Sequence, residues 1–343
     1  MPLETSHCAN FTEIFFPVRL RAFCHVANNT AFFIAITANL LLVALINGEK
    51  KRNLRAYSTV LLLNCAFDIF TSIVAFVTQM QMEILDGYVV YIINGLLAEF
   101  SLIWHFAFTF FYCVSVCAAV NIIVVIFIFR YWLICRDLML SRRTLGALTA
   151  APLLYAILES AFIILSLAIN GSTRSCWQIL DNPIWWEPGT RRPPNKCLFT
   201  PTNNTWFIAT IFLGIVGVNV IFGVMCMSSF YVLKTLHRKR VKFTQRTRQL
   251  QRQLNWMLFI QMSAPLFTCF FPALMLILSP ILHMSFPGIG LFVSEAFAWI
   301  PCVNPLVAIC FVASFRQRFL RSILPTRANY YFGGMASITS SSN

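Results

Sequence analysis

The sequence predicts an all-α membrane protein built as a bundle of seven transmembrane helices, and three observations lead to that class. Hydrophobic residues make up 58% of the 343, while charged residues make up only 11%. A soluble domain carries about 25% charged residues, so this chain cannot cover its apolar surface with polar side chains in water. Seven separate stretches also reach the roughly 20 apolar residues that a helix needs to cross a bilayer. They are residues 22–46, 56–79, 96–129, 144–169, 206–233, 252–279 and 287–312.

Two of these stretches carry features of their own. The third, residues 96–129, is longer than a bilayer requires, so it is predicted to tilt or to run past the membrane from an outer boundary near Asn94. The sixth contains Pro265 and Pro272, which predict bending points because proline removes a backbone hydrogen bond from a helix. Neighbouring helices can satisfy the freed carbonyls, so prolines do not argue against a span.

The distribution of basic residues predicts which side of the membrane each segment faces. Twenty of the 26 Lys and Arg residues lie in the loops after the first, third and fifth spans and in the tail after the seventh. Loops rich in Lys and Arg stay in the cytoplasm. Residues 1–21 are therefore predicted to be extracellular, residues 22–312 to form the membrane domain, and residues 313–343 to form a cytoplasmic tail.

Sequons for N-glycosylation agree with that orientation. Four Asn-x-Ser/Thr sequences are present, and all of them fall on the predicted outer side. Asn10, Asn170 and Asn203 are the candidate glycosylation sites, whereas Asn28 is expected to lie too close to the bilayer.

Four cysteines are also predicted on the outer, oxidising side: Cys8, Cys24, Cys176 and Cys197. Four cysteines allow three pairings. A disulfide between Cys176 and Cys197 is predicted because both residues belong to the same outer loop.

The longest basic run, HRKRVKFTQRTRQLQRQL from His237 to Leu254, has seven Lys or Arg residues and no acid. Basic clusters bind nucleic acid in soluble proteins, but apolar spans flank this run on both sides, so no nucleic-acid partner is predicted. The run is expected to fix the topology and to contact anionic lipid headgroups.

A short amphipathic helix is predicted over residues 314–324, directly after the last span. Phe315, Phe319 and Ile323 recur every four residues and form its apolar stripe, while the arginines lie off that stripe. Such a helix lies on the inner leaflet, and Pro325 ends it.

Seven spans are compatible with a receptor, a transporter, a light-driven pump or an intramembrane enzyme. A retinal pump needs a lysine in its last span, and all six lysines lie outside the spans. Transporters typically consist of two repeated halves, and the sequence shows no internal repeat. A hydrolase needs a nucleophile–base pair or a His/carboxylate cluster. The sequence offers neither, so no enzymatic activity and no cofactor are predicted.

Five short motifs, in order and at matching membrane depths, carry a family resemblance. They are FDIFTS at Phe67–Ser72, YC at Tyr112–Cys113, IFRYWLICR at the end of the third span, LQRQLNWMLFIQMSAPLFTCFFP at the start of the sixth, and IPCVNPLVAICFVASFRQRFL at the close of the seventh. Over residues 35–324 the chain resembles the nematode seven-transmembrane chemoreceptors of the Str superfamily, which includes the Str, Srd, Srj, Srh and Sri classes.

The resemblance implies a G-protein-coupled receptor in the plasma membrane of a sensory cilium. It would detect an odorant or another environmental small molecule and activate a heterotrimeric G protein through its alpha subunit. The residues expected to couple are Arg130 and Tyr131 at the cytoplasmic edge of the third span and Leu250, Gln251 and Gln253 at the base of the sixth. Without the resemblance, Arg130 is simply a helix-end arginine that snorkels to the membrane surface.

The broader rhodopsin-like pattern is matched only in part. Asn64 and Asp68 stand where that pattern has a polar pair, and Asn304-Pro305 resembles its seventh-span motif. Phe129 replaces the acid before the arginine, so an acid–arginine lock is not expected. A buried acid is costly unless it is paired, and Asp68 is expected to hydrogen-bond with Asn304. That pair, Pro305 and the two prolines of the sixth span form the predicted conformational switch.

Seven residues in the outer halves of the spans are candidates for ligand contacts. They combine ionisable groups with aromatic walls, as small-molecule sites do, and they are Glu99, Trp104, His105, Tyr112, Glu159, Glu295 and Trp299. Aromatic residues also gather at membrane interfaces without any ligand. Two other functions stay open: a transporter or ion channel that moves a solute past Asp68 and Glu295, and a membrane scaffold without a ligand.

Overall fold

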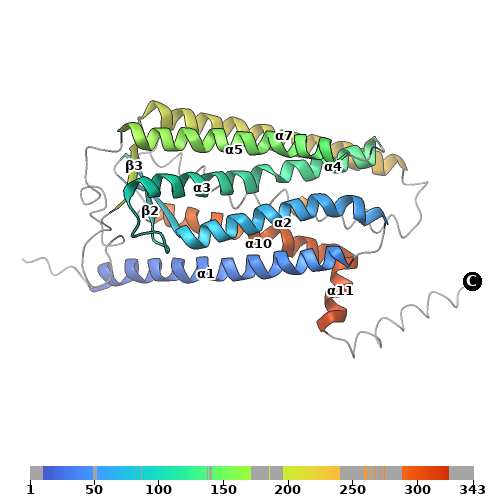
Figure 1. Ribbon diagram of the computed structural model, residues 1–343, viewed down its shortest axis with the longest axis horizontal. Coiled ribbons are helices and arrows are strands. Elements are labelled where there is room, and N and C mark those ends of the chain that lie inside the picture. The colour runs from blue at the N-terminus through green and yellow to red at the C-terminus, as the bar shows by residue number, and fades with distance from the viewer. Residues whose placement is uncertain are drawn as a thin grey trace, which may run out of the picture.

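The structure, a computed structural model, is a bundle of long helices that run side by side (Figure 1). It describes residues 11–48, 52–85, 87–136, 138, 141–170, 185, 196–239, 259–260, 263, 267, 271, 274 and 288–323. The helices are α1 (Phe11–Asn47), α2 (Arg52–Thr78), α3 (Leu102–Asn121), α4 (Ile123–Cys135), α5 (Arg142–Asn170), α7 (Thr205–Lys239), α10 (Ile289–Phe311) and α11 (Ala313–Ile323). The strands are β1 (Met80–Leu85), β2 (Tyr88–Ile93) and β3 (Leu198–Pro201).

Within the described part of the chain, six helical segments are long and apolar enough to cross a bilayer. α3 and α4 together form one of them, Leu102–Cys135, and α1, α2, α5, α7 and α10 supply the others. Helices suit this environment because they satisfy each backbone N–H and C=O group within one segment. The sixth predicted stretch, residues 252–279, lies almost wholly outside the described residues.

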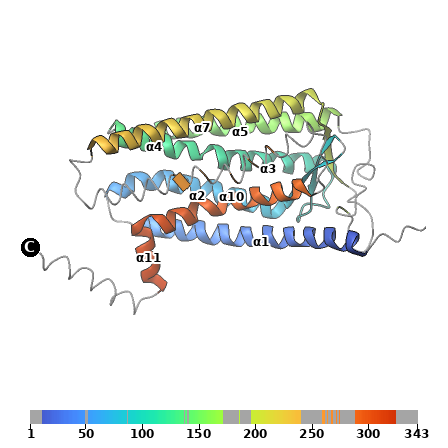
Figure 2. The same ribbon diagram turned by 180° about the vertical axis from the view of Figure 1, so that it is seen from behind.

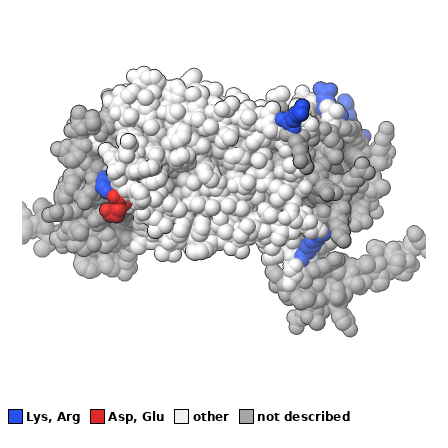
Figure 3. All heavy atoms as spheres, viewed as in Figure 1, with Lys and Arg blue, Asp and Glu red and all other residues white. Residues whose placement is uncertain are grey.

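Charged side chains are confined to the two ends of the bundle on the face drawn in Figure 3. Among the described residues of that face, the middle carries no Lys, Arg, Asp or Glu. Basic side chains lie at the end of the bundle that carries α11, and an acid and a base lie at the opposite end. This is the surface expected of a bundle whose middle contacts lipid and whose ends lie among the headgroups.

The structure adds a small antiparallel sheet that the prediction of an all-α bundle did not include. β1 and β2 form a hairpin in which Met80 pairs with Ile93 and Leu85 pairs with Tyr88, and β3 pairs with the other edge of β2. Gly87 in the connecting turn has a φ of 79°, a conformation that glycine adopts without strain. We call this end of the bundle the hairpin end and the other the α11 end.

The third predicted span differs most from its helix. Residues 95–100 form turns after the hairpin, and the helix begins only at Leu102. Ile122 interrupts it, and α4 continues in the same direction to Cys135 (Figure 1). α1 also differs, because it begins at Phe11 and so includes part of the segment predicted as a separate N-terminal tail.

Two large apolar clusters hold the helices together. One lies toward the α11 end and contains Leu42 of α1 and Phe127 of α4. The other lies toward the hairpin end and contains Tyr91 of β2 and Val116 of α3. α1 packs against α10 and α2, α3 against α5, and α4 against α7, and the view from behind in Figure 2 shows the same neighbours. In lipid, such interhelical packing is a main source of helix association.

α11 turns away from the end of α10 and runs across the bundle axis (Figure 1). Its Phe315 is buried in the cluster at the α11 end. Arg318 Nη1 donates to Leu45 O of α1 at 3.2 Å, and Arg316 Nη1 donates to Cys310 O of α10 at 3.3 Å. Cations at the last carbonyls of a helix stabilise the negative end of its dipole. A helix that crosses the bundle axis in this way is placed to lie on a membrane surface.

Candidate functional site

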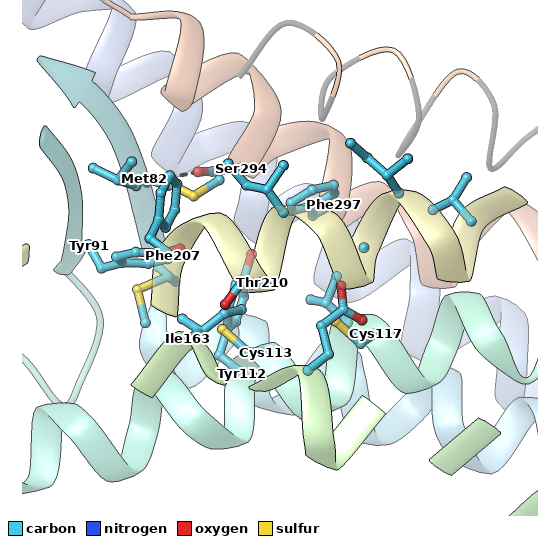
Figure 4. Close-up of a pocket in the computed structure, with 18 of the residues that line it drawn as sticks. Met82, Tyr91, Tyr112, Cys113, Cys117, Ile163, Phe207, Thr210, Ser294 and Phe297 are labelled. Carbon is cyan, nitrogen blue, oxygen red and sulfur yellow. Dashed lines mark hydrogen bonds between the residues drawn. The ribbon is translucent and has the colours of Figure 1, made fainter. Parts of the chain in front are cut away.

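A cavity of about 470 Å³ lies between the hairpin and helices α3, α5, α7 and α10. Its volume falls within the range of small-molecule sites, about 300–1,000 Å³. Figure 4 shows Met82, Tyr91 and Phe207 on the side of the hairpin and Cys117 farther into the bundle. The cavity therefore extends from the hairpin toward the middle of the membrane-spanning helices.

Strand alternation builds the roof of this cavity. Successive side chains of a strand point to opposite faces, so Met80, Met82 and Ile84 of β1 all line it. Glu83, between the last two, points to the other face and is fully buried there. Tyr91 pairs with Met82 in the hairpin register and adds a wall from β2.

Glu159 of α5 supplies a carboxyl to the deeper part of the cavity. The Cys117 thiol of α3 donates a hydrogen bond to it. Gly214 of α7 leaves it room, because a Cβ at that position would come within 3.1 Å of Glu159 Oε1. At about 1.5 Å per residue, Glu159 lies roughly 16 Å along α5 from the end of the helix at Asn170, close to the middle of a span.

Hydroxyl groups around the cavity differ in whether they can still donate. Thr210 Oγ1 and Ser294 Oγ each donate to a carbonyl one turn earlier in their own helices, at 2.9 and 2.8 Å. Their remaining capacity is as acceptors. The Tyr91 hydroxyl makes no hydrogen bond to a described residue. Burial raises the pKa of Tyr91 above its ordinary value, so this hydroxyl keeps its proton and can donate it.

Glu83 fastens the hairpin to the start of α10. Its Oε2 accepts a hydrogen bond from Gly288 N at 2.9 Å, and its Oε1 accepts one from Gly290 N at 3.2 Å. These N–H groups belong to the helix start, where no intrahelical acceptor is available and the dipole favours negative charge. Residue 290 must be glycine, because a Cβ there would collide with the Met82 carbonyl. Burial raises the pKa of Glu83 to about 7, and the N–H donors offset part of that rise.

A further contact joins the same two elements. Met82 N donates to Ser294 Oγ at 3.0 Å, drawn as a dashed line in Figure 4. Both residues line the cavity. The roof and α10 are therefore linked at the cavity wall itself as well as at Glu83.

A second polar centre joins α2 to α10. Asp68 is fully buried, and its Oδ2 accepts hydrogen bonds from Asn64 Nδ2 at 2.8 Å and from Asn304 Nδ2 at 3.4 Å. The structure thus brings Asp68 and Asn304 together, as the sequence analysis expected. The second carboxyl oxygen, Oδ1, has no hydrogen-bond partner among the described residues.

α1 compensates for a proline in α10. Pro305 has no N–H, so the carbonyl of Pro301, four residues earlier, loses its partner within the helix. Asn39 Nδ2 donates to that carbonyl at 3.1 Å and to Ala35 O of its own helix at 2.9 Å. A neighbouring helix therefore satisfies the freed carbonyl, as membrane bundles require.

Comparison with known proteins identifies the family to which this architecture belongs. The model of the family described as serpentine type 7TM GPCR chemoreceptor Str matches residues 24–320, most of the chain. The chain belongs to this family. The resemblance carried by the five sequence motifs is thereby confirmed, and the chain is a seven-transmembrane membrane protein of the receptor type rather than a member of an enzyme family.

Solved structures show the same fold. The crystal structure of squid rhodopsin matches this receptor with a TM-score of 0.62 over 88% of the chain and 84% of squid rhodopsin. The two sequences are 12% identical, so the likeness concerns the fold alone. Among curated protein sequences, none matches the receptor.

Of the seven predicted ligand residues, Tyr112 and Glu159 line the cavity of the receptor. The other five do not. Glu99 is exposed at the hairpin end, and Trp104 is 52% exposed and stacks on Phe108 with ring centroids 5.9 Å apart. Trp104 therefore lies on the outside of the bundle.

The remaining three are held in other contacts. The ring of His105 is buried and its Nε2 lies 3.1 Å from Ala98 O, a hydrogen bond that closes the turn before α3. Trp299 packs with small residues of α1 and α10. Glu295 lies near Cys24 of α1 and is not among the residues that line the cavity.

Sequence reasoning missed the residues of the hairpin. Met82, Glu83 and Tyr91 lie between the second and third predicted spans, where no strand was predicted, although they build the roof and its link to α10. A signal was present, because Asp-Gly between alternating apolar residues favours a hairpin, and the sequence reads MQMEILDGYVVYII from Met80 to Ile93.

The predicted coupling residues of the receptor are described only in part. Arg130 is buried, with 2% of its surface exposed, which does not fit an arginine that snorkels to the membrane surface. Tyr131 packs edge-on against Tyr231 of α7, with ring centroids 5.9 Å apart. The other predicted coupling and bending residues lie outside the described part: Leu250, Gln251, Gln253, Pro265 and Pro272.

The structure describes some of the residues that were predicted to form the outer disulfide or to carry glycans. Cys197 is disulfide-bonded, and Cys24 is a free thiol. The partner of Cys197 and the predicted Cys176 both lie outside the described residues, so the pairing stays a prediction. Asn203 is exposed next to β3, Asn170 is the last residue of α5, and Asn10 is outside the described part.

Proposed function

We propose that this receptor detects a small, largely apolar molecule in the cavity beneath the hairpin and activates a heterotrimeric G protein. The observation that carries the proposal is the cavity itself, which is of small-molecule size and is lined by the hairpin and by four helices. Membership of a chemoreceptor family supports the class of function. The buried aromatic and aliphatic lining is what an apolar ligand requires.

Signal transfer would follow the contacts of α10. A ligand in the cavity touches Met82 and Ser294, which join the roof to α10. The same helix carries Asn304, which contacts Asp68 near the middle of the bundle. A shift of α10 would alter that contact, and Pro305 lies beside it in the sequence. A ligand drives such a shift only through different affinities for the two states, and a nearly complete shift takes about 5 kcal/mol of difference.

At the α11 end, opening of the bundle would expose Arg130, which is buried in this structure. The G protein alpha subunit would then contact it together with Tyr131, Leu250, Gln251 and Gln253. Tyr131 supports this assignment because it packs on Tyr231 of α7, so movement between α4 and α7 reaches it directly. In this proposal the two prolines of the predicted sixth span, Pro265 and Pro272, permit the bending that opens the end of the bundle.

The membrane placement is also proposed. The hairpin end would lie outside and the α11 end in the cytoplasm, as the basic loops favour, with the plasma membrane and a sensory cilium as the location. Glycans would then attach to Asn10, Asn170 and Asn203, and Cys176 would pair with Cys197. Anionic lipids would contact the basic segment before the predicted sixth span.

The proposed function is tested by screening a chemical panel against cells that express the receptor with a calcium or cyclic-nucleotide reporter. A compound that evokes a response is then applied to Arg130→Ala, which should abolish signalling at unchanged surface expression. Arg136→Ala is the matched control, because Arg136 is exposed at the end of α4, and it should signal normally.

Two outcomes would contradict the proposal. Full signalling by Arg130→Ala would remove the assigned coupling site. Solute flux through the purified protein in liposomes, without any G protein, would favour the transporter or channel function instead.

A further inference from the structure

The cavity contains an acid without a basic side chain to pair with it. Among the described residues that line it there is no Lys, Arg or His. The sequence extends this to the predicted sixth span, because no Lys, Arg or His occurs between Arg252 and His283. Lys196, at the hairpin end, donates to two backbone carbonyls at 2.8 and 3.1 Å. An ionised Glu159 at this depth is costly without a counter-charge. No described residue of the cavity lining supplies one, so a cation that enters the cavity would stabilise the ionised form.

Thr210 and Glu159 both present hydrogen-bond acceptors to the cavity. Thr210 has already committed its hydroxyl hydrogen to the Trp206 carbonyl. The Glu159 carboxylate accepts hydrogen bonds and donates none when ionised. A ligand rich in N–H donors therefore finds partners here, whereas a ligand with only carbonyl oxygens meets lone pairs. The Tyr91 hydroxyl, which can donate, belongs to the hairpin side of the cavity (Figure 4).

The shape of the cavity sets which end of a ligand goes deepest. Met82, Tyr91 and Phe207 lie at the hairpin side, and Cys117, which hydrogen-bonds to Glu159, lies at the deep side (Figure 4). Gly214 lets the carboxyl lie close to α7, because a Cβ at that position would come within 3.1 Å of Glu159 Oε1. The apolar body of a ligand is thus accommodated toward the hairpin, and its polar head is accommodated at Glu159.

We infer that the cavity selects a small apolar amine, whose ammonium group pairs with Glu159 and whose hydrocarbon body fills the space beneath the hairpin. This inference rests on the proposed function of the same cavity and adds the chemical class of its ligand. One proton is held between the two groups. An uncharged amine takes this proton from the protonated carboxyl. An ammonium ion brings the proton with it, and the carboxyl then first releases its own proton to water.

The test compares amines with alcohols of the same carbon skeleton on the purified full-length receptor in lipid nanodiscs. The probes are phenethylamine against phenethyl alcohol and cyclohexylmethylamine against cyclohexylmethanol, and binding is measured by titration calorimetry in the absence of G protein. The amines are expected to bind at least about tenfold more tightly, because a hydrogen bond to a charged group is the stronger one. Glu159→Gln, which keeps the size of the side chain and removes its charge, should abolish that preference.

Two matched controls separate binding from folding. Glu295→Gln alters an acid of α10 that lies near Cys24 of α1, and it should keep the full amine preference. Gly214→Ala places a methyl group beside the Glu159 carboxyl and should weaken amine binding severalfold. Gly223→Ala adds the same methyl group to the same helix, where nothing lies within 4 Å, and should bind as the unaltered receptor does.

Every outcome bears on the inference. Equal binding of amines and alcohols, full amine preference in Glu159→Gln, or no binding of either amine would overturn it. Amine binding that depends on Glu159, with no G-protein response in cells, would overturn the proposed function and leave the ligand class standing. Cells that respond to neutral odorants alone, equally well with Glu159→Gln, would leave the receptor function standing and overturn the ligand class.

Discussion

Asp68 and Glu159 are both carboxyl groups at membrane depth, and their surroundings differ. Asp68 is fully buried and accepts hydrogen bonds from amides of α2 and α10. Glu159 is half-buried, accepts a hydrogen bond from a thiol, and borders a cavity of about 470 Å³. An ionisable group inside a membrane is a candidate functional residue by default, but its packing decides which function. The packed acid joins helices, and the acid beside open space is available to a ligand.

Removal of the two acids should therefore have very different consequences for stability. Asp68→Ala should lower the free energy of unfolding by about 2–4 kcal/mol, because it leaves the buried amides of Asn64 and Asn304 without their acceptor. Glu159→Ala mainly enlarges an existing cavity and should cost less than about 1 kcal/mol. Thermal unfolding of both purified variants in one detergent measures the difference. Equal losses would remove the distinction between a packed acid and a cavity acid.

A third acid, Glu83, lies outside the spans. It is packed as Asp68 is, and its carboxyl titrates at a pH at which the stability of the receptor can be measured. Its pKa of about 7 in the folded receptor exceeds the ordinary value of 4.5, so the folded state holds a proton that the unfolded chain has lost. The stabilisation is fully present below the ordinary value and is lost as the pH rises through about 7. Its upper limit is about 3.5 kcal/mol, since one pKa unit corresponds to about 1.4 kcal/mol.

The matched variant for this prediction is Glu83→Gln, which has the same shape and does not titrate. The unaltered receptor should lose stability relative to Glu83→Gln between about pH 5 and about pH 8. Other titrating groups cancel in that difference. A difference in unfolding temperature that is the same at every pH would contradict the assignment of this titration to Glu83.

The bundle could be predicted from the sequence because the thickness of a bilayer fixes the length of an apolar helix. α5 spans Arg142–Asn170 where residues 144–169 were predicted, and α10 spans Ile289–Phe311 where residues 287–312 were predicted. The Asp68–Asn304 contact was also foreseeable, since a buried acid needs a polar partner. Each of these features follows from a general requirement on proteins in membranes and does not depend on how individual side chains pack.

The cavity could not be predicted in the same way. Its walls come from elements far apart in the chain, and helices that are apolar on all sides give no periodic signal of which face points inward. Glu159 and Glu295 look alike in the sequence, yet one lines the cavity and the other lies near α1. The hairpin was missed for a different reason, because its apolar residues lie between two predicted spans, where no strand was predicted.

Two asparagines allow a second comparison between a polar group that bridges helices and a polar group beside the cavity. Asn39 donates to Pro301 of another helix at 3.1 Å, whereas Asn219 lines the cavity and donates to Ile215 of its own helix at 2.7 Å. Asn39→Ala should cost about 1–2 kcal/mol, because it leaves a buried carbonyl unpaired. Asn219→Ala should change the free energy of unfolding by less than about 0.5 kcal/mol. A similar loss in both variants would mean that bridging helices is not what makes a polar group matter for stability here.

A small effect is expected for a hydrogen bond beside Glu159 itself. Tyr155 lies one turn before Glu159 on α5, and its hydroxyl donates to Leu213 O of α7 at 2.5 Å. Tyr155→Phe should cost about 0.5–1 kcal/mol, the net value of one neutral hydrogen bond, and should leave the preference for amines over alcohols unchanged. Thermal unfolding and the same calorimetric titration measure the two quantities on one sample. A loss as large as that of Asp68→Ala would show that the residues around Glu159 are as important for stability as those around Asp68. The proposed difference between the two acids would then be wrong.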